Sequence, residues 1–268
     1  MTVLEGIILG IVQGLTEFLP VSSSGHIELG KAILGVAPEE NMAFTVAVHG
    51  ATVLSTMAVF WREILRLLQG LLRLEWNRET RYIVQILVSM LPVGLVGLLL
   101  KDQLELLFAG SVLMVGCMLL HTALLLVCAH FAPKGGGGGL RLSRGEPTLA
   151  SSLIMGLGQA LAVVPGLSRS GTTISLGLLS GVSSSAATEF SFLMVLPPII
   201  GMNLLELLGG DFTAGSISAM PLLAGSIAAF VSGYIACRWM LHLVRRGKLL
   251  WFALYCAAAG SVAIIYGL

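Results

Sequence analysis

Six apolar stretches run through this sequence, each about as long as a helix that crosses a lipid bilayer, for which about 20 apolar residues are needed. They cover residues 42–60, 82–100, 110–130, 187–208, 218–237 and 249–267. Charged residues make up only 11% of the chain, whereas a soluble domain carries about 25%. A soluble enzyme, a nucleic-acid-binding protein and a disordered chain are therefore excluded. We expect an all-α polytopic membrane protein.

Two further apolar stretches, at about 4–34 and 150–180, are interrupted by polar segments that contain proline and glycine. We call LPVSSSGH at 19–26 the first break and VPGLSRSGTT at 164–173 the second break. Neither half of such a stretch is long enough to span a bilayer, so each stretch is predicted to form a re-entrant pair of short helices. Irregular backbone at membrane depth must be surrounded by protein or by a water-filled cavity.

Basic residues predict how the chain is oriented, because cytoplasmic loops carry an excess of Lys and Arg. Twelve of the fifteen Lys and Arg residues lie in the three segments 61–81, 131–149 and 238–248. These segments are therefore expected to be cytoplasmic, and both termini to lie outside, with the protein in the cell (inner) membrane. Segment 131–149 is rich in glycine and is expected to be a flexible linker.

A shift of 146 residues superimposes the two interrupted stretches. Six of the sixteen positions from 10 to 25 are then identical: Gly10 and Gly156, Gln13 and Gln159, Leu15 and Leu161, Ser22 and Ser168, Ser24 and Ser170, Gly25 and Gly171. The chain thus reads as two repeats, at 1–130 and 150–268, each with one re-entrant pair and three spans. Because three is odd, the second repeat is expected to be inverted, and such repeats place a binding site near the membrane midplane.

Three ionisable residues fall at or beside the breaks: Glu17, His26 and Arg169. Ionisable side chains inside a membrane are costly, so they indicate a functional site unless they form a purely structural ion pair. Gln13 and Glu17 share one helical face, which can offer two oxygens to a divalent cation or one to a proton. The guanidinium of Arg169 matches phosphate oxygens in a bidentate way.

Hydroxyl groups and helix starts surround these charges. The run Ser22–Gly25 can form an anion-binding nest at the start of a half-helix, and the run Ser168–Thr173 adds a second helix start. The spacing of Ser23 and His26 suits a hydroxyl nucleophile beside a base. Together the two breaks predict a pocket for a phosphate or pyrophosphate. His49 and Glu189 are further polar residues that could line it.

The segments QGLTEFLPVSSSGH at 13–26 and PGLSRSGTT at 165–173 resemble the two signature motifs of undecaprenyl-pyrophosphate phosphatases, the bacitracin-resistance family. The span pattern and FSFLMVLPP at 190–198 agree, so the resemblance covers nearly the whole chain. It implies an integral membrane hydrolase that removes one phosphate from undecaprenyl pyrophosphate and recycles the carrier lipid for peptidoglycan synthesis. It also implies an active site that opens to the periplasmic side and a requirement for a divalent cation, Mg or Ca.

Carried over residue by residue, the resemblance implies that Glu17, Ser23, His26 and Arg169 are catalytic, with Glu17 as the metal ligand. Ser168 and Thr173 match family positions that support the phosphates, and Gln13 stands where some members carry glutamate. The residues expected to bind substrate are Gln13, Ser22, Ser24, Gly25, Ser168, Ser170, Gly171, Thr172 and Thr173.

Alternatives remain open at this point. In the favoured mechanism Ser23 attacks phosphorus while His26 takes its proton; His26 as nucleophile and direct attack by water are the others. A lipid-phosphate flippase or transporter that uses the same midplane site is the rival function, since inverted repeats with broken helices are a transporter architecture. The expected partners are a polyprenyl pyrophosphate and membrane lipids, with no nucleic acid. Small-residue spacing in the spans also permits a homodimer.

Overall fold

The computed structural model describes residues 1–34, 41–99, 112–132, 142–143, 145–209 and 218–267. Six helical segments are long and apolar enough to cross a membrane, which confirms the six predicted spans. They are Phe44–Leu72, Arg78–Gly97, Val112–His130, Ser184–Gly201, Ala219–Val244 and Leu249–Gly267. The chain is therefore a multi-pass, all-helical membrane protein.

In the first half of the chain these spans belong to α3 (Asn41–Leu72), α4 (Arg78–Leu99) and α6 (Val112–His130). The predicted end of the first span at residue 60 is wrong, because α3 bends at Phe60 and continues to Leu72. Exposed Arg62 and Arg66 lie on this extension. A hydropathy pattern stops where charges begin, whereas a helix can continue past the hydrocarbon region.

In the second half the spans are built from α9 (Ser184–Leu193) with α10 (Leu196–Gly209), α11 (Ala219–Arg245) and α12 (Leu249–Gly267). The predicted span 187–208 is divided at Met194 and Val195, just before Pro197 and Pro198. Proline has no N–H to donate and fits best in the first turn of a helix, and α10 starts afresh with both prolines in its first turn.

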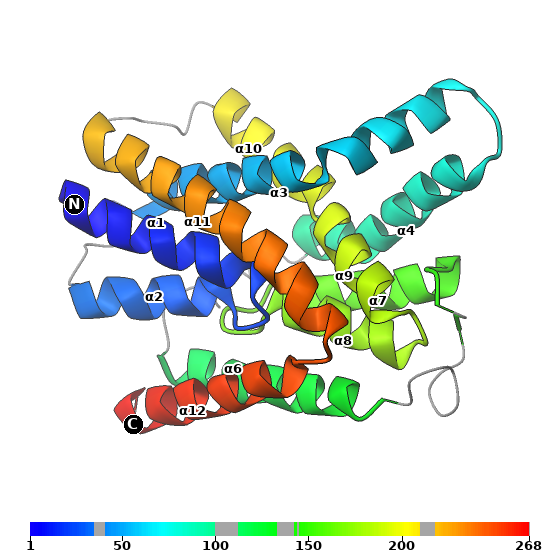
Figure 1. The fold of residues 1–268 in the computed structure, drawn as a ribbon. Helices are drawn as coiled ribbons and strands as arrows, with labels where there is room; N and C mark the ends of the chain where they lie inside the picture. Colours follow the sequence, from blue (N-terminus) through cyan, green and yellow to red (C-terminus); the bar gives the residue numbers. More distant parts are fainter. Residues whose placement is uncertain (35–40, 100–111, 133–141, 144, 210–217, 268) are drawn as a thin grey trace.

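The two interrupted stretches form four short helices, α1 (Val3–Phe18), α2 (Ser23–Leu34), α7 (Leu149–Leu161) and α8 (Arg169–Leu179). Each is shorter than the ~20 residues that a span requires. Thr2 and Thr148 close capping boxes at the outer ends of α1 and α7. Figure 1 shows α1 and α2 in one half of the molecule and α7 and α8 in the other, so both breaks lie near its middle.

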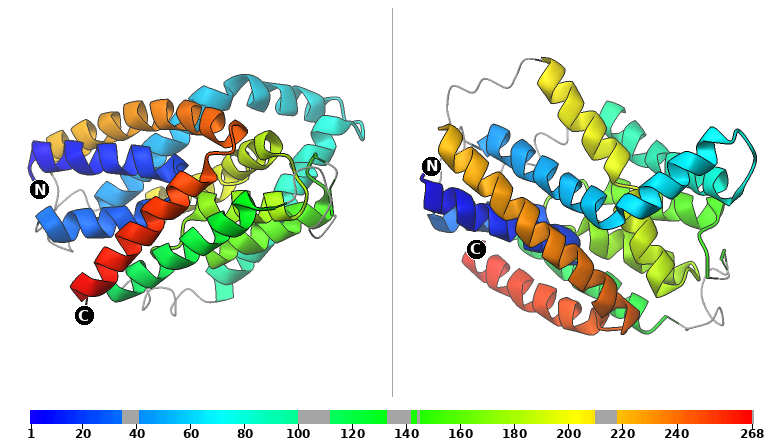
Figure 2. Two further views of the ribbon diagram at one scale, coloured as in Figure 1. Left: turned by 60° about the horizontal axis from the view of Figure 1, so that its bottom comes forward. Right: turned by 45° about the horizontal axis from the view of Figure 1, so that its top comes forward.

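Each helix pair packs on a long helix from the other half of the sequence: α1 lies along α11, and α7 lies along α4. Glycines permit both contacts. A Cβ added to Gly10 would lie 2.2 Å from the carbonyl oxygen of Gly225, and one added to Gly156 would lie 2.3 Å from that of Ser89. Helices α6 and α12 lie side by side in the same way (Figure 2), with Gly116 against Gly260.

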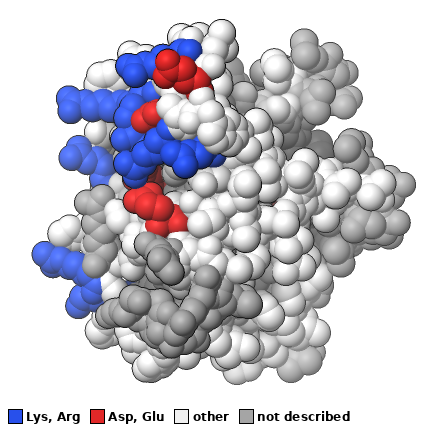
Figure 3. Space-filling view, turned by 90° about the vertical axis from the view of Figure 1, so that its right-hand side faces the viewer, with Lys and Arg blue, Asp and Glu red and all other residues white. Residues whose placement is uncertain are grey.

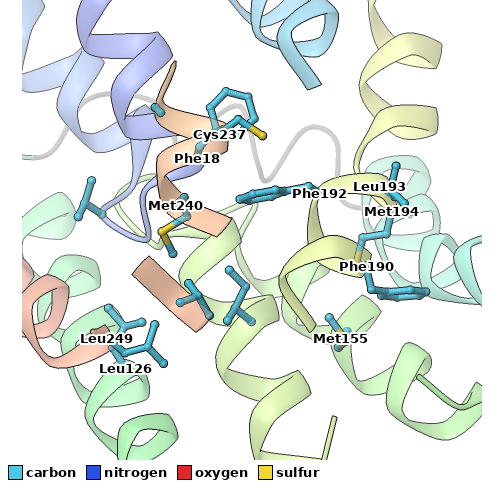
Figure 4. Packing of buried hydrophobic residues seen from close by; sticks show 14 of the residues in the cluster. Phe18, Leu126, Met155, Phe190, Phe192, Leu193, Met194, Cys237, Met240 and Leu249 are labelled. Carbon is cyan, nitrogen blue, oxygen red and sulfur yellow. The ribbon is translucent and has the colours of Figure 1, made fainter. Parts of the chain in front are cut away.

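The main core brings together buried side chains from both halves of the chain, among them Phe18, Leu126, Phe192 and Met240 (Figure 4). Phe192 packs edge-on against Phe18, with ring centroids 5.5 Å apart, and Phe60 contacts Phe192 at 6.2 Å. Phe190 and Met155 are fully buried nearby. Phe18 adjoins Glu17, so this aromatic cluster fixes the inner end of α1.

Charge is concentrated at one end of the molecule. The end of α3, the α3–α4 connection and the start of α4 carry five exposed basic residues: Arg62, Arg66, Arg73, Arg78 and Arg81. Figure 3 shows Lys and Arg gathered on this end, whereas both termini lie at the opposite end in Figure 1. Large apolar side chains such as Leu91, Leu124 and Ile265 stay exposed on the spanning helices, as contact with lipid requires. Most of the predicted linker 131–149 lies outside the described residues.

Candidate active site

The two breaks touch each other in the middle of the molecule. The hydroxyl of Ser170, in the first turn of α8, donates a hydrogen bond of 3.1 Å to the carbonyl oxygen of Leu19 in the first break. Arg169, the first residue of α8, forms an ion pair with Glu17 in the last turn of α1. Residues 152 positions apart are therefore joined at the point where each short helix pair turns back.

Glu17 is the centre of this contact and is only 8% exposed. One carboxylate oxygen, Oε1, accepts from the guanidinium of Arg169. The other, Oε2, accepts from the hydroxyl of Ser23 at 2.6 Å and from the amide of Gln13 at 3.1 Å, and it lies 4.0 Å from Nε2 of His49. The carboxylate is thus held in one orientation by donors from α1, α2 and α8, with α3 alongside.

Arg169 contacts a second element besides the helix that carries Glu17. Its second terminal nitrogen donates to the carbonyl oxygen of Ser191 in α9 at 3.5 Å, and its side chain is 17% exposed. Thr173, one turn along α8, donates to the carbonyl oxygen of Arg169 at 2.9 Å and shares a hydrogen bond of 2.6 Å with the hydroxyl of Ser191. The guanidinium is therefore braced from two helices while one edge stays accessible.

The two breaks end in the same capping hydrogen bond. Ser22 caps α2 by accepting from the amide of Gly25 at 3.3 Å, and Ser168 caps α8 by accepting from the amide of Gly171 at 3.1 Å. Ser22 has a φ of 71°, an unusual backbone conformation for a residue other than glycine. These four residues occupy matching positions at the offset of 146. Both helices begin at the centre, with their positive dipole ends beside Glu17 and Arg169.

The remaining hydroxyl groups that were expected to bind substrate differ in their hydrogen-bond partners. Ser24 lies 3.4 Å from Ser22, and Ser170 lies 3.4 Å from Ser168, hydroxyl to hydroxyl. Thr172 is buried, and its hydroxyl has no hydrogen-bond partner among the described residues. The structure therefore brings the expected serine and threonine residues to the starts of α2 and α8, but several of their hydroxyls serve the helix caps, and Gln13 lies within α1.

His26 does not pair with Ser23 in this structure. Its Nδ1 lies 2.7 Å from the carbonyl oxygen of Ser22, and its Nε2 lies 2.6 Å from the hydroxyl of Tyr255 in α12. The hydroxyl of Ser23 donates to Glu17 instead. The spacing of the two residues along the chain suggested a serine–histidine pair, but the first turn of α2 directs the two side chains to different partners.

A pocket opens at the ion pair. Its lining residues come from α1, α3, α8, α9, α10 and the α9–α10 junction: Glu17, Phe18, Thr52, Val53, Thr56, Arg169, Phe192, Val195 and Ile199. One side carries the carboxylate and the guanidinium, and the other is aromatic and aliphatic. The lining thus places a charged pair beside an apolar wall. Neither His49 nor Glu189, which the sequence suggested as lining residues, is among them, although His49 lies 4.0 Å from the Glu17 carboxylate.

A divalent cation would find limited ligands here. Within the described ranges, no three His, Cys, Asp or Glu side chains are grouped so that they could hold a metal ion. Glu17 is the carboxylate of the site, and Oε1 of Gln13 is buried beside it with no hydrogen-bond partner among those residues. Mg²⁺ is often held by one or two carboxylates together with substrate phosphates, so these two oxygens fit such an ion.

Some residues of the site could not be found from a motif. Thr122 in α6 accepts from the amide of Ser168 at 3.0 Å, and Tyr255 bonds His26 from the far end of the chain. Ser191 lies in the segment FSFLMVLPP, whose resemblance to the family was the one hint in the sequence that this residue belongs to the site. The two contacts from α6 and α12 depend on tertiary packing alone.

Comparison with known proteins gives a consistent result. Residues 6–262 match the family described as bacitracin resistance protein BacA. The undecaprenyl-diphosphatase of Bacteroides fragilis is 49% identical over 264 residues, which cover 97% of each chain. That of Parabacteroides distasonis is 49% identical over 267 residues, 98% of each chain. That of Methanosphaera stadtmanae is 36% identical over 280 residues, 99% of this chain and 98% of the relative.

Proposed function

This chain belongs to the bacitracin resistance protein BacA family, and we propose that it carries out the family's reaction at the Glu17–Arg169 site. It is an undecaprenyl-diphosphatase, which hydrolyses undecaprenyl pyrophosphate to undecaprenyl phosphate and inorganic phosphate. Its biological role follows from the family: it recycles the carrier lipid for the cell wall. The observation that carries our placement of the site is the buried Glu17 carboxylate, which pairs with Arg169 at the edge of an apolar pocket and accepts a hydrogen bond from Ser23.

Binding of the pyrophosphate is assigned to Arg169 and to the two helix starts. The first turn of a helix has amide groups without a carbonyl partner in the helix, and these bind phosphate oxygens. Helices α2 and α8 both begin at the contact between the breaks. Catalysis of phosphoryl transfer needs positioning and neutralisation of charge above all, and this arrangement supplies both. The apolar walls formed by Val53, Phe192 and Ile199 receive the start of the prenyl chain.

Ser23 is the nucleophile in our mechanism. Its hydroxyl donates to Glu17 at 2.6 Å, so the carboxylate can take the proton as the oxygen attacks the terminal phosphorus. A new bond forms between phosphorus and Oγ of Ser23, and undecaprenyl phosphate leaves. Water then hydrolyses the phosphoserine. This assignment moves the role of base in the first step from His26 to Glu17, because Glu17 is the group within hydrogen-bond distance.

His26 is assigned to the second step. A carbonyl oxygen can only accept, so the contact with Ser22 places a hydrogen on Nδ1 and leaves the lone pair on Nε2. This nitrogen takes a proton from the water that attacks the phosphoserine. His26 stands one helical turn after Ser23, which places the base on the same side of α2 as the phosphoserine.

A divalent cation is part of the proposal. Glu17 and the unpaired Oε1 of Gln13 would hold it together with phosphate oxygens. When bound, the ion neutralises charge on the transferred phosphoryl group. The rest of the site binds and orients the substrate with or without the ion.

The arrangement of the halves belongs to the same proposal. We assign the chain two inverted repeats, 1–130 and 150–268, in the inner membrane, with both termini and the opening of the site on the periplasmic side. The repeated cap of Ser22 and Ser168 and the matching contacts of α1 and α7 with long helices support this assignment. So does the basic end opposite the termini.

A phosphate-release assay on purified protein in detergent tests the mechanism. With undecaprenyl pyrophosphate as substrate, we expect release by the wild type and none above background from Ser23→Ala. A matched control is Ser261→Ala, an exposed serine that bonds only within α12. Brief incubation and rapid quenching should trap an acid-stable phosphoserine at position 23. An acid-labile phosphohistidine at position 26 would make His26 the nucleophile, and no covalent species in any variant would favour direct attack by water.

A further inference from the structure

Tyr255 is the one side chain of α12 that bonds a side chain of the proposed catalytic set, as far as the described residues extend. Its hydroxyl lies 2.6 Å from Nε2 of His26, and the two rings are stacked at 5.5 Å with an angle of 17°. The next residue, Cys256, is buried and donates through its sulfur to the carbonyl oxygen of Pro20 in the first break. A helix 229 residues away in the sequence therefore rests on the start of α2.

The direction of the hydrogen bond between Tyr255 and His26 follows from the other side of the ring. Nδ1 faces a carbonyl oxygen, which only accepts, so in the neutral ring the hydrogen is on Nδ1. Nε2 is then a bare acceptor, and the phenol must donate to it. The contact with Tyr255 therefore occupies the nitrogen that we assign as the base.

A purely structural role for Tyr255 would be to hold α12 in place, but other residues already do this. Helix α12 lies along α6, where a Cβ added to Gly260 would come within 2.8 Å of the carbonyl oxygen of Gly116. Tyr255 itself is 47% exposed, so its ring contributes little to a buried interface. Its hydroxyl nevertheless points to His26, and the rings are nearly parallel.

We propose that Tyr255 is a positioning residue for His26, holding the imidazole by a stack and a hydrogen bond so that Nε2 faces the water of the second step. This inference rests on the function proposed above. When the phenol hydrogen rotates away, the lone pair of Nε2 is open to that water. Once Nε2 carries a proton, the phenol oxygen can accept from it, because a tyrosine hydroxyl both donates and accepts. The ring is thus held in both of its proton states.

The first test is kinetic and uses Tyr255→Phe, which keeps the stacked ring and removes the hydroxyl. We expect kcat to fall by about three- to tenfold, the loss typical of one hydrogen bond, with KM for undecaprenyl pyrophosphate within about twofold. Tyr255→Leu, which removes the stack as well, should lower kcat further. Tyr266→Phe is the matched control on the same helix, since Tyr266 is 87% exposed. A higher kcat in Tyr255→Phe, or a change confined to KM, would overturn the proposal.

The second test does not depend on activity. Protein labelled with ¹⁵N-histidine in detergent micelles reports the protonation of each ring nitrogen, and His26→Ala identifies the signals of His26. We expect the Nδ1–H form in the wild type, and a shift of the Nε2 signal in Tyr255→Phe but not in Tyr266→Phe. An unchanged Nε2 signal would overturn the contact. If the signal shifts and kcat does not, the positioning role is wrong. If the wild type releases no phosphate, the proposed function fails while the spectrum still decides the contact.

Discussion

Glu17 receives donors from three elements: Gln13 in its own helix, Ser23 in α2 and Arg169 in α8. Leaving one member of a buried ion pair without its partner costs about 3–5 kcal/mol. The same carboxylate is our acceptor for the proton of Ser23. One residue thus joins the stability of the two breaks to the first chemical step.

Glu17→Gln tests both roles, each by its own measurement. The amide keeps the shape and can still accept a hydrogen bond, but it cannot take a proton, so we expect phosphate release to fall by about 100-fold or more. The loss of charge beside Arg169 should also lower the unfolding temperature. Both are measured on purified protein, by phosphate release and by thermal unfolding.

The control for this variant is Glu146→Gln, at an exposed glutamate that pairs with Arg78 3.4 Å away. Near-normal activity in Glu17→Gln would remove Glu17 as the base. It would return that role to His26, as the sequence first suggested.

Much of the site could be predicted at the scale of residues, because the two breaks carry unusual polar groups in an apolar chain. The convergence of Glu17, Ser23 and Arg169 followed from the repeat. The partner of Ser23 did not, since spacing along the chain cannot say which of two nearby acceptors a hydroxyl meets. Tyr255 was missed altogether: one tyrosine near the interior of an apolar span has no local pattern that sets it apart.

At the scale of elements, helices cross closely where glycine stands at the crossing. Gly10 lets α1 approach α11, and Gly156 lets α7 approach α4. In membranes, helices associate through such close packing, since lipid is as apolar as the side chains. The crossings position the inner ends of α1 and α7, and hence Glu17 and the second break.

Gly10→Ala and Gly156→Ala should therefore destabilise the protein. The added methyl groups would come within 2.2 Å and 2.3 Å of backbone carbonyl oxygens, so the helices must separate. We expect a loss of about 1–3 kcal/mol, typical of overpacking, seen as a lower unfolding temperature in detergent.

Gly94→Ala and Gly97→Ala provide the comparison, because nothing lies within 4 Å of a Cβ added at either position. Equal unfolding temperatures for all four variants would show that the crossings at Gly10 and Gly156 do not contribute to stability.

The existence and order of the helices could be predicted from hydropathy, and their lengths only in part. Helix α3 continues to Leu72 and α11 to Arg245, where charged residues had suggested loops. Charges exclude a segment from the hydrocarbon region but do not end a helix. The division of the fourth span before Pro197 was not part of the hydropathy prediction, which treats 187–208 as one segment.

At the scale of the whole molecule, the two ends differ in charge. The α3–α4 connection is basic and exposed, and the termini lie at the other end. The retention of Lys and Arg on the cytoplasmic side predicts that this connection faces the cytoplasm.

Labelling with a membrane-impermeant maleimide tests this orientation. In a background where exposed Cys117 and Cys128 are alanine, Arg73→Cys should react only in inside-out vesicles. Ser218→Cys, exposed at the start of α11, should react in intact spheroplasts. The opposite pattern would reverse the topology and place the site on the cytoplasmic side.

The packing of each short helix pair on the other half of the chain has a consequence for biosynthesis. As the protein leaves the ribosome, α1 and α2 are made first, but α11, on which α1 rests, begins only at Ala219. Glu17 lacks its ion-pair partner until Arg169 has been made, and the glycine face of α1 lacks the helix on which it packs until α11 follows. The newly made α1–α2 pair must therefore stay without its final contacts, in the insertion machinery or at the membrane surface, until α11 is made. The contact between the two breaks is therefore completed late in the synthesis and insertion of the protein.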